Sequence, residues 1–214
     1  MFYLRPPSVD EVQAFVSQQR NSTFSYSEIG ASAGQIPHGY TVDRNRILLG
    51  SGEATWKRAV KAVGEWQMFN IPWIRLFWPY SPIAVGVDVA ILINHLGFCS
   101  LNASRIVYVV DEDGPVAKYG FAYGTLLEHA ESGEERFTVE WNRSEDQVWY
   151  NIVAFSKPNK RLAKVGLPFA RTSRKDLAKP QRPLCARQPV QGDRVRSAAL
   201  ATSVTPPATR RKLR

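Results

Sequence analysis

Apolar and polar residues alternate strictly along Phe137-Thr138-Val139-Glu140-Trp141. Successive side chains of a β-strand point to opposite faces, so this pattern predicts a strand with one apolar and one polar face. Similar segments lie on both sides of it, joined by short turns such as Asp111-Glu112-Asp113-Gly114, whose Asp-Gly pair tolerates the positive φ of a hairpin. We therefore predict an antiparallel meander of six strands, at Trp73–Trp78, Gly86–His95, Phe98–Val110, Val116–Gly124, Glu135–Trp141 and Val148–Phe155.

A helix is predicted over about residues 8–19, ahead of these strands. Ser8 and Glu11 have the spacing of a capping box, in which each side chain bonds the other residue's backbone N–H. The residues that follow place apolar side chains on one helical face. Residues 20–45 are rich in Ser, Gly and Asn and are expected to form a long loop with one short strand near Thr23–Tyr26.

A second helix is predicted from Ser51, its expected N-cap, to about Trp66, directly after a short strand at Arg46–Gly50. The run Gly50-Ser51-Gly52-Glu53-Ala54-Thr55 resembles the start of a dinucleotide-binding fingerprint, but Thr55 stands where the third glycine belongs. Antiparallel strands follow it instead of a βαβ unit. A tight strand-to-helix turn is therefore preferred over a nucleotide site, and no cofactor is predicted.

A last helix is predicted after Pro158, with Pro168 kinking or splitting it. Beyond about Thr172 the chain consists largely of Pro, Ala, Arg, Ser and Gln without periodicity, which indicates disorder. The predicted class is α+β: a curved antiparallel sheet of six to seven strands grips the C-terminal helix, with an extra N-terminal helix. Residues 1–172 form this helix-grip domain and residues 173–214 a disordered basic tail. Such a sheet often leaves an apolar cavity beneath its helix.

The net charge of +9 is concentrated in the tail, because residues 171–214 hold 12 of the 28 Lys and Arg but two of the 19 Asp and Glu. A charge argument for binding phosphate backbones or acidic membranes therefore applies to the tail alone. No aromatic residue is interleaved there to stack on bases, so no specific nucleic-acid partner is predicted. A solubilising extension is the simpler interpretation.

Cys99 and Cys185 lie in a predicted strand and in the tail, so a structural disulfide is not expected, and no CxxC pair predicts a metal site. The N-terminus has no apolar segment of a secretory signal. The longest apolar stretch, Ile83–Ile93, is interrupted by Asp88 and is too short to span a bilayer. These observations favour a cytoplasmic location without a transmembrane segment.

Candidate catalytic residues lie in and before the run Glu128–Arg136, which holds four acids, one histidine and one arginine. His129, Glu134 and Glu135, with Tyr123, have the chemistry of a general acid–base cluster, and the run around His129 also has that of an open metal site. The alternative is a solvated loop between strands.

Candidate ligand-binding residues come from the neighbouring strands. In Tyr119–Thr125 the aromatic residues Tyr119, Phe121 and Tyr123 share one face and small residues share the other. Core packing explains this pattern, but the hydroxyls of Tyr108, Tyr119 and Tyr123 are also able to orient an apolar ligand in a cavity.

Further polar groups gather near a strand junction. His95, Asn102 and Arg105 are added to the ligand-binding set for that reason. A half-buried Arg105 requires a carboxylate, for which Glu140 is one candidate, and such a structural ion pair is the alternative to anion recognition.

Five segments together resemble the domain-of-unknown-function family numbered nineteen-ninety, found in bacteria and plants. They are Asp43–Gly52, His95–Tyr108, Phe121–Leu126, Glu131–Phe137 and Trp149–Ser156. The resemblance covers about residues 5–172 and excludes the tail. It implies kinship with the helix-grip superfamily of lipid-transfer domains, polyketide cyclases and pollen allergens, and it implies no particular activity.

Three functions remain open. The first is binding of a small apolar or amphipathic molecule between the sheet and the C-terminal helix, which the aromatic-rich sheet and the lack of a nucleophile–base pair favour. The second is an enzyme of cyclase or hydrolase type that uses acid–base residues in the same cavity. The third is an interaction protein whose basic tail binds nucleic acid or a membrane surface.

Overall fold

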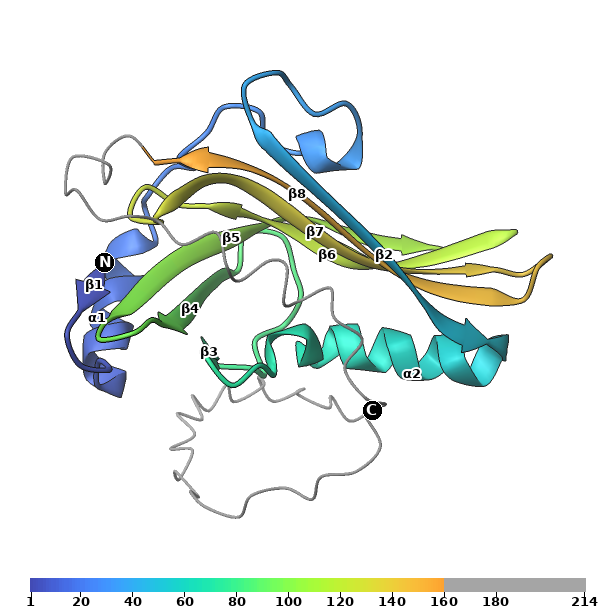
Figure 1. Cartoon of the computed structure of the whole chain (residues 1–214), viewed down its shortest axis with the longest axis horizontal. Coiled ribbons are helices and arrows are strands. Elements are labelled where there is room, and N and C mark those ends of the chain that lie inside the picture. Colours follow the sequence, from blue (N-terminus) through green and yellow to red (C-terminus); the bar gives the residue numbers. More distant parts are fainter. Residues whose placement is uncertain (160–214) are drawn as a thin grey trace, which may run out of the picture. The chain divides into compact units, whose positions relative to one another are not determined.

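The computed structural model describes residues 1–159, which form two α-helices, two short 3-10 helices and one eight-stranded sheet (Figure 1). In chain order the elements are β1 (Phe2–Tyr3), α1 (Val9–Gln19), η1 (Ala31–Ala33), β2 (Thr41–Ser51), α2 (Gly52–Gly64), η2 (Gln67–Phe69), β3 (Ile74–Phe77), β4 (Asp88–Asn94), β5 (Cys99–Glu112), β6 (Val116–Thr125), β7 (Glu131–Asn142) and β8 (Gln147–Pro158).

The sheet is antiparallel throughout, and β3 to β8 follow one another across it in chain order. This confirms the predicted meander of six strands and the α+β class. Strand β2, which comes before the meander in the chain, pairs with its last strand, β8, and forms one edge of the sheet. Strand β1 pairs with the start of β5. The short turns force each strand to pair with its predecessor, which is why the order was predictable.

The sheet curves over α2, which lies along one of its faces (Figure 1). We call this the inner face. Its core joins Ala59 and Val63 of α2 and Trp66 and Phe69 near η2 to apolar side chains of β4 to β8. The two helices lie on opposite faces, because the residues that α1 contacts alternate along the strands with those that α2 contacts.

The outer face is covered by α1 and by residues 20–40. Val12 and Phe15 of α1 pack on Leu92 of β4 and Leu101 of β5, and all four side chains are buried. The predicted capping box starts this helix: the Glu11 amide donates to the Ser8 hydroxyl at 3.2 Å, and the Ser8 amide donates to the Glu11 carboxylate at 2.6 Å.

Three local predictions were wrong. Strand β2 begins at Thr41 and not at Arg46, because β8 pairs with it along its whole length and so orders a charged segment of weak strand propensity. Strand β7 begins at Glu131, so most of the acidic run is strand and not solvated loop. The Ser51 side chain makes no capping bond, and the Asp146 carboxylate accepts from the Gly52 amide at 3.1 Å instead.

The helix predicted after Pro158, its kink at Pro168, the domain end at residue 172 and the basic tail lie outside the described residues. Within the described part of the chain, the helices are too short and too polar to cross a membrane.

Candidate functional site

The inner face holds a group of three polar side chains, Tyr123 of β6, Glu135 of β7 and Tyr150 of β8, which we call the inner polar group. Tyr123 and Glu135 are direct cross-strand partners, and the Tyr123 hydroxyl donates to the Glu135 carboxylate at 2.7 Å. The Tyr150 hydroxyl is buried and has no hydrogen-bond partner. Burial and the nearby Glu135 charge both raise the pKa of Tyr150, so its phenol stays protonated.

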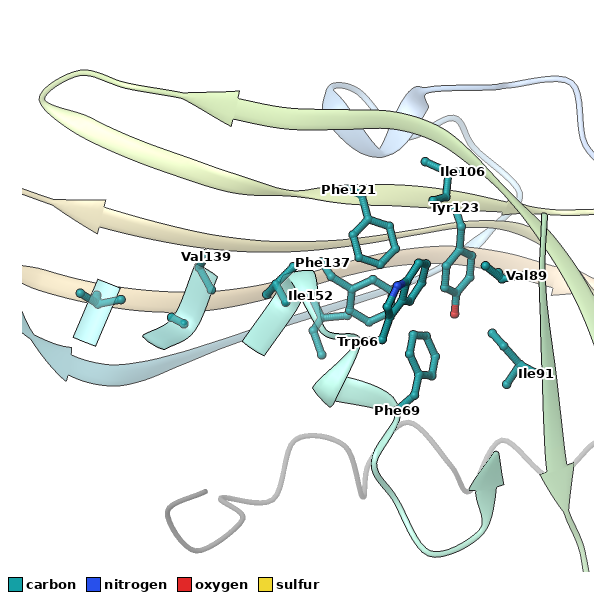
Figure 2. Close-up of a cluster of buried hydrophobic side chains, with 13 residues drawn as sticks. Trp66, Phe69, Val89, Ile91, Ile106, Phe121, Tyr123, Phe137, Val139 and Ile152 are labelled. Carbon is teal, nitrogen blue, oxygen red and sulfur yellow. The ribbon is translucent and has the colours of Figure 1, made fainter. Parts of the chain in front are cut away.

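Aromatic rings surround Tyr123, the β6 member of the inner polar group (Figure 2). The Tyr123 and Phe137 ring centroids lie 5.5 Å apart, and Phe69 of η2 lies 5.7 Å from Phe137. The ring centroids of Trp66 and Phe121 lie 4.7 Å apart. Two phenol hydroxyls and one carboxylate therefore share a face with an apolar surface, which is the composition of a site for an amphipathic molecule.

His95 and Asn102 belong to a second polar chain on the inner face, near the turn between β6 and β7. The His95 imidazole bonds the Ser100 hydroxyl at 2.9 Å, and burial lowers the pKa of His95. The Asn102 amide donates to Ser100 and accepts from the Ala130 amide at 3.3 Å. The neighbouring Ser104 hydroxyl is buried without a partner.

Glu134 lies on the opposite face from Glu135, because adjacent strand residues alternate. Its carboxylate is 2% exposed and accepts from the Tyr26 hydroxyl at 2.7 Å and from the Gly30 and Ser32 amides at 2.7 and 3.0 Å. The Ser32 hydroxyl also donates to it. The carboxylate thus holds the loop ahead of β2 against the sheet, and burial with the Glu134 contact raises the pKa of Tyr26.

The three candidate tyrosines do not form one site. Tyr119 and Tyr123 lie on the inner face as predicted, and Tyr119 lies beside Gly64 of α2. A bulge between Ile106 and Tyr108 turns the Tyr108 side chain to the outer face, where its hydroxyl lies 2.6 Å from that of Ser32. Burial raises the pKa of Tyr108.

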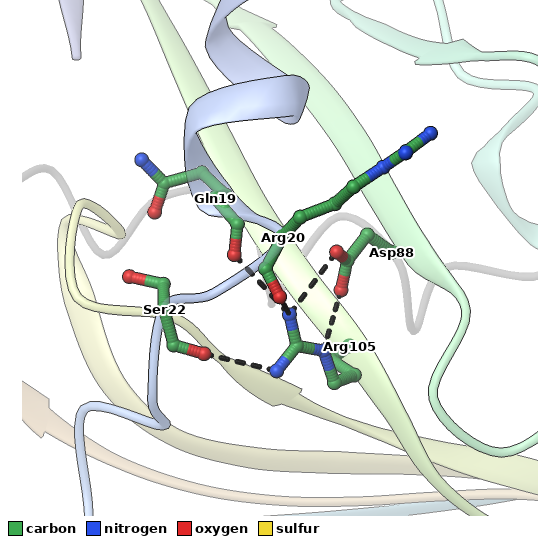
Figure 3. Close-up of polar contacts among 5 residues, drawn as sticks. All are labelled: Gln19, Arg20, Ser22, Asp88 and Arg105. Carbon is green, nitrogen blue, oxygen red and sulfur yellow. Dashed lines mark hydrogen bonds and ion pairs between the residues drawn. The ribbon is translucent and has the colours of Figure 1, made fainter.

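The predicted pairing of Arg105 with Glu140 is wrong. Arg105 of β5 faces Asp88 of β4 directly across the outer face and bonds it through Nε at 2.6 Å (Figure 3). Its other nitrogens donate to the backbone oxygens of Gln19, Arg20 and Ser22 at the end of α1. Every guanidinium nitrogen is thus bonded to the protein itself, although the pair borders an open depression of about 530 Å³.

His129 lies in the turn between β6 and β7, where its Nδ1 accepts from the Glu131 amide at 2.9 Å. It is therefore not part of the inner polar group. Among residues 1–159, no three His, Cys, Asp or Glu side chains come close enough together to hold a metal ion.

Sequence reasoning missed Tyr150, Tyr26 and Ser32 as functional-site neighbours. For Tyr150 a signal was present: extending the alternation of Val148 and Ile152 places it on the inner face. For Tyr26 and Ser32 there was none, because their contact with Glu134 spans more than a hundred residues of irregular backbone and strand.

The chain has relatives of unassigned function. A family model described as "Domain of unknown function (DUF1990)" matches residues 25–187. A UPF0548 protein of Dictyostelium discoideum is 34% identical over 190 residues, which cover 80% of this chain and 88% of that protein. A UPF0548 protein of Deinococcus radiodurans is 36% identical over 185 residues, covering 80% and 86%. A UPF0548 protein of Arabidopsis thaliana is 32% identical over 146 residues, covering 66% and 69%.

A solved structure, the hypothetical protein jhp0584 from Helicobacter pylori, is 10% identical to this chain with a TM-score of 0.37. The match covers 66% of this chain and 83% of the Helicobacter chain. That likeness is too weak to support an inference about this protein.

Proposed function

Because the chain belongs to the DUF1990 family, whose description names no activity, we propose from the site itself that this protein binds a small amphipathic molecule on the inner face. The polar end of the ligand bonds the inner polar group, and its apolar part extends along the inner face.

The single observation that carries this proposal is the Tyr150 hydroxyl, which is buried without a partner. A buried hydroxyl normally has one, because desolvation without a hydrogen bond costs about 1–3 kcal/mol. Tyr150 is close enough to Glu135 for that charge to affect its pKa, and Glu135 is bonded to Tyr123. Glu135 lies two inner-face positions along β7 from Val139, the cross-strand partner of Tyr150, so a ligand that bonds Tyr150 and extends along this face reaches the carboxylate and the second phenol.

Native mass spectrometry of protein purified from its source tests the proposal first, followed by thermal shift with long-chain fatty acids and hydroxylated polycyclic aromatics. We expect a copurified mass and stabilisation by at least one class of probe. Tyr150→Phe, which removes one oxygen, should weaken that binding about tenfold. Tyr80→Phe is the matched control, since Tyr80 is 97% exposed. An empty protein with no thermal response to either class contradicts the proposal.

An enzyme of cyclase or hydrolase type is the second candidate, favoured by the bond between Tyr123 and Glu135. Such a pair suits a general base beside a proton donor. Incubating the bound molecule with the protein and following its mass separates the two functions. Turnover that Glu135→Gln abolishes while binding persists supports the enzyme, and an unchanged ligand in the wild-type protein excludes it.

A further inference from the structure

Three buried polar atoms without hydrogen-bond partners lie side by side on the outer face. They are Nε of Arg136, Oγ1 of Thr138 and Nδ2 of Asn151. Thr138 and Asn151 are direct cross-strand partners on β7 and β8, and Arg136 is the next residue of β7 on the same face. Cross-strand partners have Cβ atoms about 5 Å apart, and same-face neighbours on a strand lie about 7 Å apart.

All three atoms can donate a hydrogen bond and so require an acceptor. An arginine Nε and an asparagine Nδ2 donate hydrogen bonds and accept none, while a threonine hydroxyl does either. Buried donors are nearly always paired, so three adjacent exceptions indicate a bound group that supplies acceptors. Since one donor carries a positive charge, an oxyanion satisfies the set better than a neutral carbonyl.

The surrounding charges are compatible with an anion. Arg44 and Arg46 of β2 lie on the same face, opposite Val153 and Asn151 of β8. Both are exposed, so the edge strand offers access from its side. Arg136 forms no ion pair with any carboxylate within residues 1–159, although Glu134 and Glu140 flank it on β7.

The two flanking carboxylates are already engaged. Glu134 is bonded to the loop ahead of β2, and Glu140 lies 3.8 Å from Arg46. Arg46 in turn lies over the Trp149 ring at 4.3 Å. The cluster, Glu134 and Glu140 included, has a net positive charge because three arginines face two acids.

We propose that the outer face of β7 and β8 binds a small oxyanion, a phosphate or carboxylate group, through Arg136, Thr138 and Asn151. The site is separate from the inner polar group, because the sheet lies between the two. It does not depend on the function proposed above.

Thermal unfolding of the full chain in sodium phosphate, sodium acetate and sodium chloride at equal ionic strength tests this site. Phosphate or acetate is expected to raise the Tm above its value in chloride. The anion that raises the Tm more shows whether the site prefers a phosphate or a carboxylate group. Arg136→Met should raise the Kd of that anion about tenfold or more. Arg58→Met removes the same charge from the exposed face of α2 and should leave the Kd unchanged.

Thr138→Val keeps the proposal testable if Arg136→Met fails to fold, because it replaces a hydroxyl by a methyl group of the same shape. We expect this variant to be more stable than the wild type without anion and to bind the anion several-fold more weakly. The basic tail is present in every variant, so differences between them report the site alone. The proposal is overturned if no anion shifts the Tm, or if all variants respond equally.

Discussion

The inner face of the sheet and the part of the outer face that residues 20–40 cover are closed by different kinds of interaction. The inner face is packed by aromatic and aliphatic side chains, with Phe121 fully buried between Trp66 and Phe137. The outer face holds residues 20–40 through a buried carboxylate, Glu134. Apolar contacts are non-directional, whereas hydrogen bonds fix geometry. Apolar packing under α2 and α1 therefore supplies stability, and the hydrogen bonds of Glu134 specify the path of an irregular loop.

Phe121→Ala should have the largest effect and tests the apolar half of this comparison. Removing a fully buried aromatic ring is expected to lower the free energy of unfolding by about 3–5 kcal/mol. Urea unfolding measures the change. Val109→Ala is the control, because Val109 is the cross-strand partner of Phe121 but is 38% exposed. Equal losses in the two variants would show that burial of Phe121 does not govern the stability of this face.

Glu134→Gln tests the polar half. The substituted amide keeps the shape but places an N–H₂ group among donors from Tyr26, Gly30 and Ser32, so about 2–4 kcal/mol should be lost. Urea unfolding and amide exchange of residues 24–34 measure it. Glu140→Gln on the same face, half-buried and 3.8 Å from Arg46, should cost less than about 1 kcal/mol. If the amides of residues 24–34 exchange at wild-type rates in Glu134→Gln, the Glu134 carboxylate does not hold this loop against the sheet.

The positions of the strands could be predicted from the sequence more fully than the side-chain contacts between them. Period-two alternation locates β7, where buried inner-face residues alternate with polar ones, whereas β4 reads as an apolar run because α1 also buries its outer face. The same alternation, extended three residues back from Phe137, separates Glu134 from Glu135. The two acids were nevertheless grouped in one predicted site, because the strand was expected to start too late to assign their faces.

Contacts that depend on register or on irregular backbone were not predictable. Arg105 meets Asp88 because of the exact pairing of β4 with β5, and a one-residue slip would move either side chain to the inner face. The bulge beside Tyr108 has no signal in its neighbours Ile106 and Val107. Glu134 meets Tyr26 through a loop whose path no periodicity describes.

Gly124→Ala tests with a smaller change whether residues 20–40 are held against β6 on the outer face. A Cβ at Gly124 would lie 2.2 Å from the Tyr26 hydroxyl and 2.9 Å from the Phe24 ring, so the loop must move. We expect a loss of about 1–3 kcal/mol and faster exchange of the Ser25 amide, which donates to Thr125 at 2.9 Å.

Gly64→Ala is the control for this variant. Its Cβ would meet the Tyr119 hydroxyl at an ordinary 3.6 Å, and alanine favours helix by up to about 1 kcal/mol, so the change should be neutral or stabilising. A neutral Gly124→Ala with unchanged Ser25 exchange would show that the loop is not held against β6.

His95 should have the smallest effect, which appears as a pH dependence of the inner face. Burial lowers the pKa of folded His95 below its ordinary value of 6.5, so protonation favours the unfolded state. The stability that neutral His95 contributes is fully present above that ordinary value and is lost as the pH falls through it towards the folded pKa. The Tm should therefore drop less between about pH 7.5 and pH 5.5 in His95→Gln than in the wild type. The control is His38→Gln, an exposed position, which should keep the wild-type drop. If the Tm of His95→Gln drops as much on acidification as that of the wild type, burial of His95 contributes nothing to the acid sensitivity of the inner face.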